Sequence, residues 1–393
     1  IGSLVPEFIH QTSASALIES VPRWQHAQPL AIDTEFIRVD TFYPKLGLLQ
    51  LGDGQGEMLV DPVAIDDLAC LAPVLGDAGP LKIMHACSED LEVLTPYSEG
   101  AVGRVHDTQI GLAILGEGLQ LGYQKALAQV LAIDIPKDAS RSDWLARPLS
   151  DQQLNYAALD VRHLPALYEV VRERLKANEL WHIFDAECAE VCRVPKAINP
   201  DEIWRSHGNA WRLSRQQSAV LQALMRWREI EAMRRDVPRG HLLKPLSLFE
   251  MAQCLPKHLQ DLRGISELNP RVMRKDGEEI LAVIAQAAAD SIAWPVPVAV
   301  PLPREASKLF EALKRAMQAV AGDLSVPLEV LWRKRLAERI VLQAVDTSIV
   351  DALAQVDGWR APYVSPVIAE VLTAHQAQLD EWSALRQASM KSR

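Results

Sequence analysis

Four acidic residues in the first 160 positions, Asp33, Glu35, Asp90 and Asp160, constrain the fold of this chain more than any other feature. Asp33 and Glu35 stand two positions apart at the end of an apolar run, so a strand over 30–36 would project both carboxylates from one face. The other two acids lie far away in the sequence. A fold that uses all four together must bring distant segments to that one face.

The sequence around the two distant acids indicates that both can lie near this strand face. Asp90 follows the short apolar run 81–85, which predicts a strand, and it falls on the first turn of a predicted helix over 88–94. Asp160 falls in the strongly helical stretch 151–167, for which Ser150 is the expected N-cap. Tyr156 precedes Asp160 by four residues, so phenol and carboxylate leave the same helix face.

Carboxylates gathered in this way repel one another, and a hard divalent cation that prefers oxygen ligands resolves the repulsion. The pattern therefore predicts a site for two Mg²⁺ or Mn²⁺ ions, roughly 3.5–4 Å apart, of the kind that hydrolyses phosphodiester bonds. In the chain's 51 acidic residues, any single Asp or Glu is more readily explained as a helix cap or a surface charge. The joint pattern is what favours the metal site.

The chain resembles the DEDDy class of 3′→5′ exonucleases, and within that class it is most similar to bacterial ribonuclease D. The resemblance rests on three motifs, at residues 33–36, 85–90 and 156–160. It continues through residues 43–51 and 142–149, and no catalytic position departs from the family pattern. It extends over essentially the whole chain.

The resemblance implies a 3′→5′ exoribonuclease that trims precursor tRNA and other small structured RNAs and releases nucleoside 5′-monophosphates. In this interpretation Asp33, Glu35 and Asp160 bind the ion that activates water, Asp33 and Asp90 serve the ion at the leaving oxygen, and Tyr156 positions the water. The expected catalytic residues are thus Asp33, Glu35, Asp90, Tyr156 and Asp160, all but the tyrosine being metal ligands. Candidate substrate-binding residues near them are Phe36, Gln50, His85, Arg141 and Trp144.

The predicted fold is an α/β ribonuclease-H-like domain, a mixed sheet flanked by helices, followed by two all-α domains of the HRDC type. Runs at 30–36, 46–51 and 57–60 predict three consecutive strands in an antiparallel meander. The expected domains are the exonuclease domain at 1–195, a first helical domain at 205–291, a Pro-rich linker at 292–303 and a diverged second helical domain at 304–386.

Charge is distributed unevenly between these regions. The net charge is −10, yet residues 1–195 contain 28 acidic and 14 basic residues while the remainder contains 23 and 27. The mildly basic half could contact RNA phosphates, although a solvated helix face is the alternative for each residue. The candidates are Arg226, Arg228, Arg234, Arg235, Arg239, Lys244, Arg333, Lys334, Arg335 and Arg339.

Composition argues against several other classes of protein. The 5 cysteines show neither zinc-site spacing nor a disulfide framework, and no apolar run reaches the roughly 18–20 residues of a membrane span. We therefore expect a cytoplasmic protein, monomeric, with RNA as partner and no membrane contact. Two alternatives remain open: a DNA-directed exonuclease with the same catalytic residues, and a non-catalytic RNA-binding scaffold.

Overall fold

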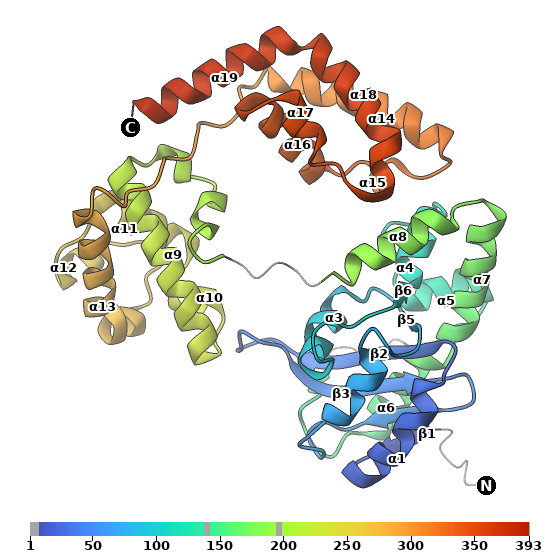
Figure 1. Cartoon of the computed structure of the whole chain (residues 1–393). Helices are drawn as coiled ribbons and strands as arrows, with labels where there is room; N and C mark the ends of the chain where they lie inside the picture. Colours follow the sequence, from blue (N-terminus) through green and yellow to red (C-terminus); the bar gives the residue numbers. More distant parts are fainter. Residues whose placement is uncertain (1–7, 137–141, 194–198, 393) are drawn as a thin grey trace.

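The computed structural model describes residues 8–136, 142–193 and 199–392. Six strands among them form one mixed sheet in the order β1-β4-β3-β2-β5-β6 (Figure 1). Their bounds are β1 (Phe8–Gln11), β2 (Leu30–Ile37), β3 (Lys45–Gly52), β4 (Glu57–Val60), β5 (Lys82–Met84) and β6 (Val105–Asp107).

The antiparallel meander predicted from the sequence is confirmed. β2 pairs with β3 and β3 with β4 in antiparallel register, whereas β1, β5 and β6 join by parallel pairing. Short β1 was not predicted, because four residues carry too little pattern to distinguish a strand. The mixed sheet with flanking helices agrees with the predicted fold class.

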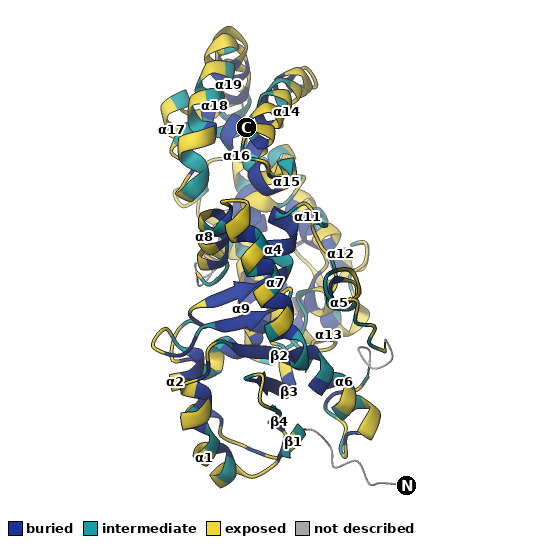
Figure 2. Ribbon diagram, turned by 90° about the vertical axis from the view of Figure 1, so that its right-hand side faces the viewer, coloured by how far each residue is buried: buried dark blue, intermediate teal, exposed yellow. Residues whose placement is uncertain are grey.

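Helices cover both faces of this sheet. The core on one face joins α1 (Ala14–Gln25), α2 (Ala72–Leu75) and α3 (Ser88–Leu94) to side chains of β2 such as Leu30 and Ile32. On the other face α6 (Asp151–Arg162) packs on β2, β3 and β4. Further helices extend this layer: α4 (Thr108–Ile114), α5 (Tyr123–Leu131), α7 (Leu164–Ala177) and α8 (Trp181–Val191). The central strands are thus buried between two helical layers, while the edge strand β1 is only partly buried (Figure 2).

Helix α6 begins where the sequence predicts. Ser150 is its N-cap and forms a capping box with Gln153, in which the Ser150 hydroxyl accepts from the Gln153 amide at 3.2 Å. The Gln153 side-chain oxygen in turn accepts a hydrogen bond from the Ser150 N–H at 3.0 Å. These bonds satisfy backbone donors that would otherwise be unpaired and define the register of the helix.

The segment before α6 is tied to the sheet by Arg147. Its guanidinium binds both carboxylate oxygens of Asp61, at 2.7 and 2.6 Å, and donates to the Gly47 carbonyl at 2.8 Å. Gly47 is required for this approach, since a Cβ there would lie 2.7 Å from the Trp144 carbonyl oxygen. The result is a rigid support for α6.

Residues from 199 to 291 form a first helical bundle, followed by an irregular segment through residue 305. Its helices are α9 (Arg215–Arg235), α10 (Arg239–Leu242), α11 (Pro245–Cys254), α12 (Leu259–Leu262) and α13 (Pro270–Ala289). A second helical bundle contains α14 (Ala306–Asp323), α15 (Leu328–Leu331), α16 (Lys334–Asp346), α17 (Ile349–Leu353), α18 (Ala361–Ala374) and α19 (Gln376–Lys391). Short 3₁₀ turns occupy Ala69–Leu71, Thr95–Tyr97, Ile203–Ser206, Ala210–Arg212 and Gly358–Arg360. In the described ranges no helix combines the length and apolarity needed to cross a bilayer.

The first helical bundle contacts the loop that follows β2. The Asp236 carboxylate accepts hydrogen bonds from the backbone amides of Phe42 and Tyr43, each at 3.0 Å. The Arg239 guanidinium lies over the Phe42 ring, 4.5 Å from its centroid. The bundle is thereby attached to the strand that carries Asp33 and Glu35.

The second helical bundle lies next to α8 (Figure 1), and one buried acid of α8 joins the two. Glu187 is 6% exposed and accepts from Arg360 at 2.5 Å, from the Trp359 indole at 2.7 Å and from Arg333 at 3.1 Å. A shared apolar core surrounds this contact and includes Phe184 of α8 and Leu331 of α15. The contact therefore buries both charge and apolar surface.

Candidate active site

Three of the predicted acids converge on one point of the sheet. Carboxylate oxygens of Asp33, Glu35 and Asp160 all lie within 4.8 Å of one another. Asp33 and Glu35 lie at this point because alternate residues of β2 face α6. Asp160 is a residue of α6 itself. A cavity of about 220 Å³ opens beside them and is lined by residues that include Asp33, Tyr156 and Asp160.

Asp90 approaches the cluster from the other side of β2. Its carboxylate accepts a hydrogen bond from the Thr34 hydroxyl, and Thr34 lies between the two acids of the strand. Asp90 is not within the group of three, but its charge acts on Asp33 and Glu35 strongly enough to raise their pKa values. All four predicted acids therefore belong to one electrostatic site.

Tyr156 lies on the same face of α6 as Asp160, as the four-residue spacing predicts. Its hydroxyl favours the ionised form of the Asp160 carboxylate and so lowers the pKa of this acid, against the larger effect of burial. Burial and then the charges of Asp160, Glu35 and Asp33 raise the pKa of this phenol. At neutral pH the phenol keeps its proton and acts as a donor.

The acids themselves are hard to ionise in the metal-free protein. Burial raises the pKa of Glu35 to about 9 and that of Asp160 to about 7. It raises the pKa of Asp90 to about 6, against the effect of the Thr34 hydrogen bond. The pKa of Asp33 is raised by burial and then by Asp90 and Asp160. Without a cation, these carboxyl groups bind protons instead.

The donor set fits a divalent cation. The three converging groups supply only carboxylate oxygens, which Mg²⁺ and Mn²⁺ prefer over nitrogen or sulfur. Their raised pKa values show that positive charge is lacking at this point, and a bound cation would provide it. The site is therefore consistent with the use of divalent metal ions.

The raised pKa values predict that the metal-free protein loses stability as pH rises. Glu35 and Asp160 bind protons more tightly when folded, so their contribution is present below pH 4 or so and is lost as pH rises through about 7 and about 9. Thermal unfolding in EDTA should show a melting temperature that falls across this range, and added Mn²⁺ should flatten the dependence. A Glu35→Gln variant should show a weaker dependence; an unchanged profile would contradict this explanation.

The candidate substrate-binding residues have different positions. Phe36 is half-buried against the core beneath β2, and His85 lines the cavity with both ring nitrogens engaged, by Thr108 and by the Leu121 carbonyl. Trp144 is 1% exposed and Gln50 is 0% exposed, so their burial argues against direct contact with substrate. Arg141 lies outside the described residues.

Two residues at the site were not identified from the sequence. Tyr123 begins α5, lines the cavity, and donates its hydroxyl to the Leu159 carbonyl at 3.3 Å. Thr34 holds Asp90. No local pattern could have indicated Tyr123, because it lies 37 positions before Asp160 and meets it only through tertiary packing. Thr34 could have been inferred, because it stands between two site residues.

The basic residues predicted to meet phosphates are mostly paired within the protein. Arg228 is 8% exposed and donates to the Leu243 carbonyl. Others form ion pairs, as the following pairs show: Arg226–Asp201, Arg234–Glu231, Arg235–Asp276, Arg239–Glu229, Lys244–Glu267, Arg333–Glu187 and Lys334–Glu338. Arg234–Glu231 and Lys334–Glu338 lie within single helices, whereas Arg235–Asp276 joins α9 to α13 and Arg333–Glu187 joins the second helical bundle to α8.

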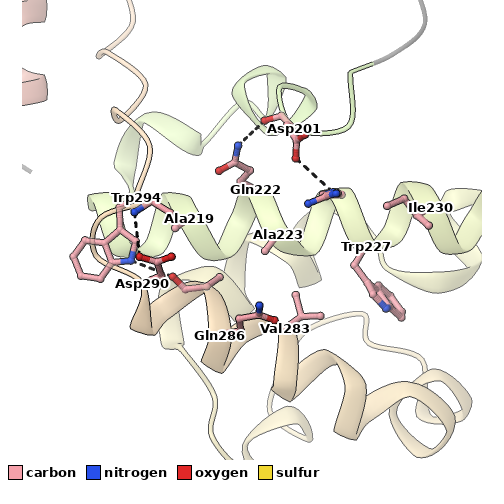
Figure 3. Close-up of a pocket in the computed structure, with 13 residues that line it drawn as sticks. Asp201, Ala219, Gln222, Ala223, Trp227, Ile230, Val283, Gln286, Asp290 and Trp294 are labelled. Carbon is pink, nitrogen blue, oxygen red and sulfur yellow. Dashed lines mark hydrogen bonds and ion pairs between the residues drawn. The ribbon is translucent and has the colours of Figure 1, made fainter.

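A larger cavity, of about 460 Å³, lies in the first helical bundle between α9 and α13 (Figure 3). Gln222 donates to the Asp201 carbonyl at 2.7 Å, and Arg226 lies 3.5 Å from the Asp201 carboxylate. Asp201 and Asp290 outnumber Arg226 in its lining, so the cavity carries a charge unfavourable for phosphate. Its lining contains no residue of the carboxylate cluster.

Comparisons with known proteins agree with this geometry. Residues 9–176 match the family described as 3′-5′ exonuclease, and residues 217–284 match the HRDC domain. The chain is 36% identical to ribonuclease D of Pseudomonas paraeruginosa, over 93% of this chain and 98% of that protein. It is 31% identical to ribonuclease D of Escherichia coli, over 87% and 92% respectively.

The fold is likewise similar to a solved structure over nearly its whole length. The crystal structure of Escherichia coli RNase D, described as an exoribonuclease involved in structured RNA processing, superposes with a TM-score of 0.86 at 28% sequence identity. The match covers 94% of this chain and 99% of the other. It therefore includes the sheet and both helical bundles.

Proposed function

The chain belongs to the ribonuclease D family, and we propose that its carboxylate cluster trims unpaired 3′ ends of small structured RNAs, precursor tRNA among them. The chain is a 3′→5′ exoribonuclease, with an exonuclease domain that contains every predicted acid. The observation that carries the assignment to this site is the convergence of Asp33, Glu35 and Asp160 within 4.8 Å. One chain supplies the whole cluster, which supports action as a monomer.

We assign the metal ligands from these positions. Asp33, Glu35 and Asp160 would hold one divalent cation, and Asp33 with Asp90 a second, Mg²⁺ and Mn²⁺ being the candidates. Such ions supply positive charge that favours ionisation of water and stabilises the leaving oxygen. The carboxylates orient that charge, and two of them, Asp90 and Asp160, are themselves buried, at 8% and 9% exposed.

Tyr156 orients the attacking water. Its phenol keeps its proton at neutral pH, so the hydroxyl can hydrogen-bond the water but cannot serve as the base. Water oxygen bonds to the terminal phosphorus as the bond to the 3′-oxygen breaks. The products are a nucleoside 5′-monophosphate and an RNA shortened by one residue with a new 3′-hydroxyl.

A digestion assay tests the substrate and the metal together. A 5′-labelled RNA with an unpaired 3′ tail should shorten from its 3′ end with Mg²⁺ or Mn²⁺ and stay intact in EDTA. A fully paired RNA and the matching DNA serve as comparison substrates. Faster shortening of DNA would favour the DNA-directed alternative, and an RNA that shifts in a gel without shortening in either metal would favour the binding scaffold.

Replacing Tyr156 with phenylalanine isolates the role of the hydroxyl. We expect kcat to fall about 10²-fold, because loss of one orienting group misplaces the attacking water, while KM for RNA changes little. Single-turnover digestion of the tailed RNA measures the rate, and Mn²⁺ titration checks that the metal site is intact. A variant as fast as wild type would remove Tyr156 from the mechanism.

A further inference from the structure

Gln50 carries a buried amide for which the described part of the chain offers no partner. The residue is 0% exposed, and both its amide nitrogen and its amide oxygen are buried without a hydrogen bond. Such groups are rare in folded proteins because each unpaired donor or acceptor costs free energy. An unpaired amide near a catalytic centre calls for a partner that binds there.

The sheet register places this amide beside the carboxylate cluster. Gln50 of β3 is paired directly with Asp33 of β2, so the two side chains leave the same face. Their neighbours confirm the face: Gly52 is paired with Ala31, and a Cβ at Gly52 would lie 3.4 Å from Val161 of α6. Paired residues of antiparallel strands have Cβ atoms about 4.5–5.5 Å apart, which a glutamine side chain can bridge.

Of the two residues paired with Gln50 in the sheet, Asp33 is the polar one. On the opposite side Gln50 is paired with Leu59, an apolar residue. Leu48, two positions along the same face, belongs to an apolar core beneath α6 together with Leu59 and Ala157. α6 covers this core, and Gln50 is fully buried beneath it, so the amide does not reach solvent.

We propose that Gln50 is a positioning residue for the metal site: its amide nitrogen, which makes no direct hydrogen bond within the described residues, donates to the Asp33 carboxylate through one buried water and fixes its orientation. This assignment rests on the proposed function of the cluster. Groups that hydrogen-bond a metal ligand in this way orient the ligand, and their removal commonly weakens metal binding 10–100-fold, as an order of magnitude. Gln50 therefore acts on the reaction without touching the substrate.

Gln50→Met in the full chain tests the proposal, since methionine keeps the length of the side chain and removes the amide. Isothermal titration with Mn²⁺, without RNA, should give a dissociation constant about 10–100-fold higher than wild type. In EDTA the melting temperature should be equal or higher, because a buried amide that has no direct partner in the protein has been removed. On RNA, kcat should fall while KM is nearly unchanged.

Leu48→Met is the matched control, because Leu48 is equally buried on the same face and the change conserves volume. It should bind Mn²⁺ as wild type does. A second variant, Gln50→Asn, keeps the amide but withdraws it by one methylene, so it should also bind Mn²⁺ more weakly.

Wild-type Mn²⁺ affinity in either Gln50 variant overturns the positioning role, whatever happens to the melting temperature. If Leu48→Met weakens Mn²⁺ binding as much as Gln50→Met does, the effect is one of packing and the proposal also fails. A wild-type protein that binds no Mn²⁺ would instead overturn the proposed function of the cluster, and this assignment with it.

Discussion

Replacing Asp33 with asparagine should nearly abolish exonuclease activity and at the same time raise the melting temperature of the metal-free protein. Burial and then the charges of the other three acids raise the pKa of Asp33. Asparagine keeps its shape but cannot hold a cation as a carboxylate does, so the rate should fall about 10³-fold or more. The gain in stability follows because a buried acid beside other acids is unfavourable until a cation binds.

Digestion of the tailed RNA with Mn²⁺ measures the first effect, and thermal unfolding in EDTA the second. Asp151→Asn is the matched control, because Asp151 is an exposed acid on the first turn of α6. It should leave activity unchanged. An Asp33→Asn protein that is both active and no more stable than wild type would contradict the assignment of this carboxyl to the metal site.

Glu187→Ala should detach the second helical bundle from α8. The substitution leaves Arg360, whose side chain is 16% exposed, without its carboxylate partner and also removes the Trp359 hydrogen bond. Breaking a buried pair from one side costs about 3–5 kcal/mol. We expect a lower melting temperature, a broader distribution of dimensions in small-angle scattering, and retained hydrolysis of a short oligonucleotide.

Glu190→Ala on the same helix is the control for this variant. Glu190 pairs with Arg193 at the surface, with both side chains more than half exposed, so its removal should cost less than about 1 kcal/mol. If the two variants unfold alike, the Glu187 contact is not what holds the bundle. If Glu187→Ala also loses hydrolysis of the short oligonucleotide, the bundle has a direct influence on the catalytic site.

The basic residues illustrate where sequence reasoning reaches its limit. Arg235 ends helix α9 and Arg239 begins α10 in the basic half, and both were candidates for phosphate contact. In the structure Arg235 binds Glu231 and Asp276, and Arg239 binds Glu229 and stacks on Phe42. The sequence shows which charges exist but not which opposite charges the fold places beside them, because a partner such as Asp276 lies 41 positions from Arg235.

The sequence by itself determined the chemistry of the site. Period-two spacing assigned Asp33 and Glu35 to one strand face, and period-four spacing placed Tyr156 with Asp160, because local backbone geometry decides these relations. The convergence of the two pairs, the tyrosine of α5, the alignment of Gln50 with Asp33, and the Glu187 contact were decided only by the tertiary structure. Each of these joins segments whose meeting depends on strand register and domain packing, which are properties of the whole chain and leave no local pattern.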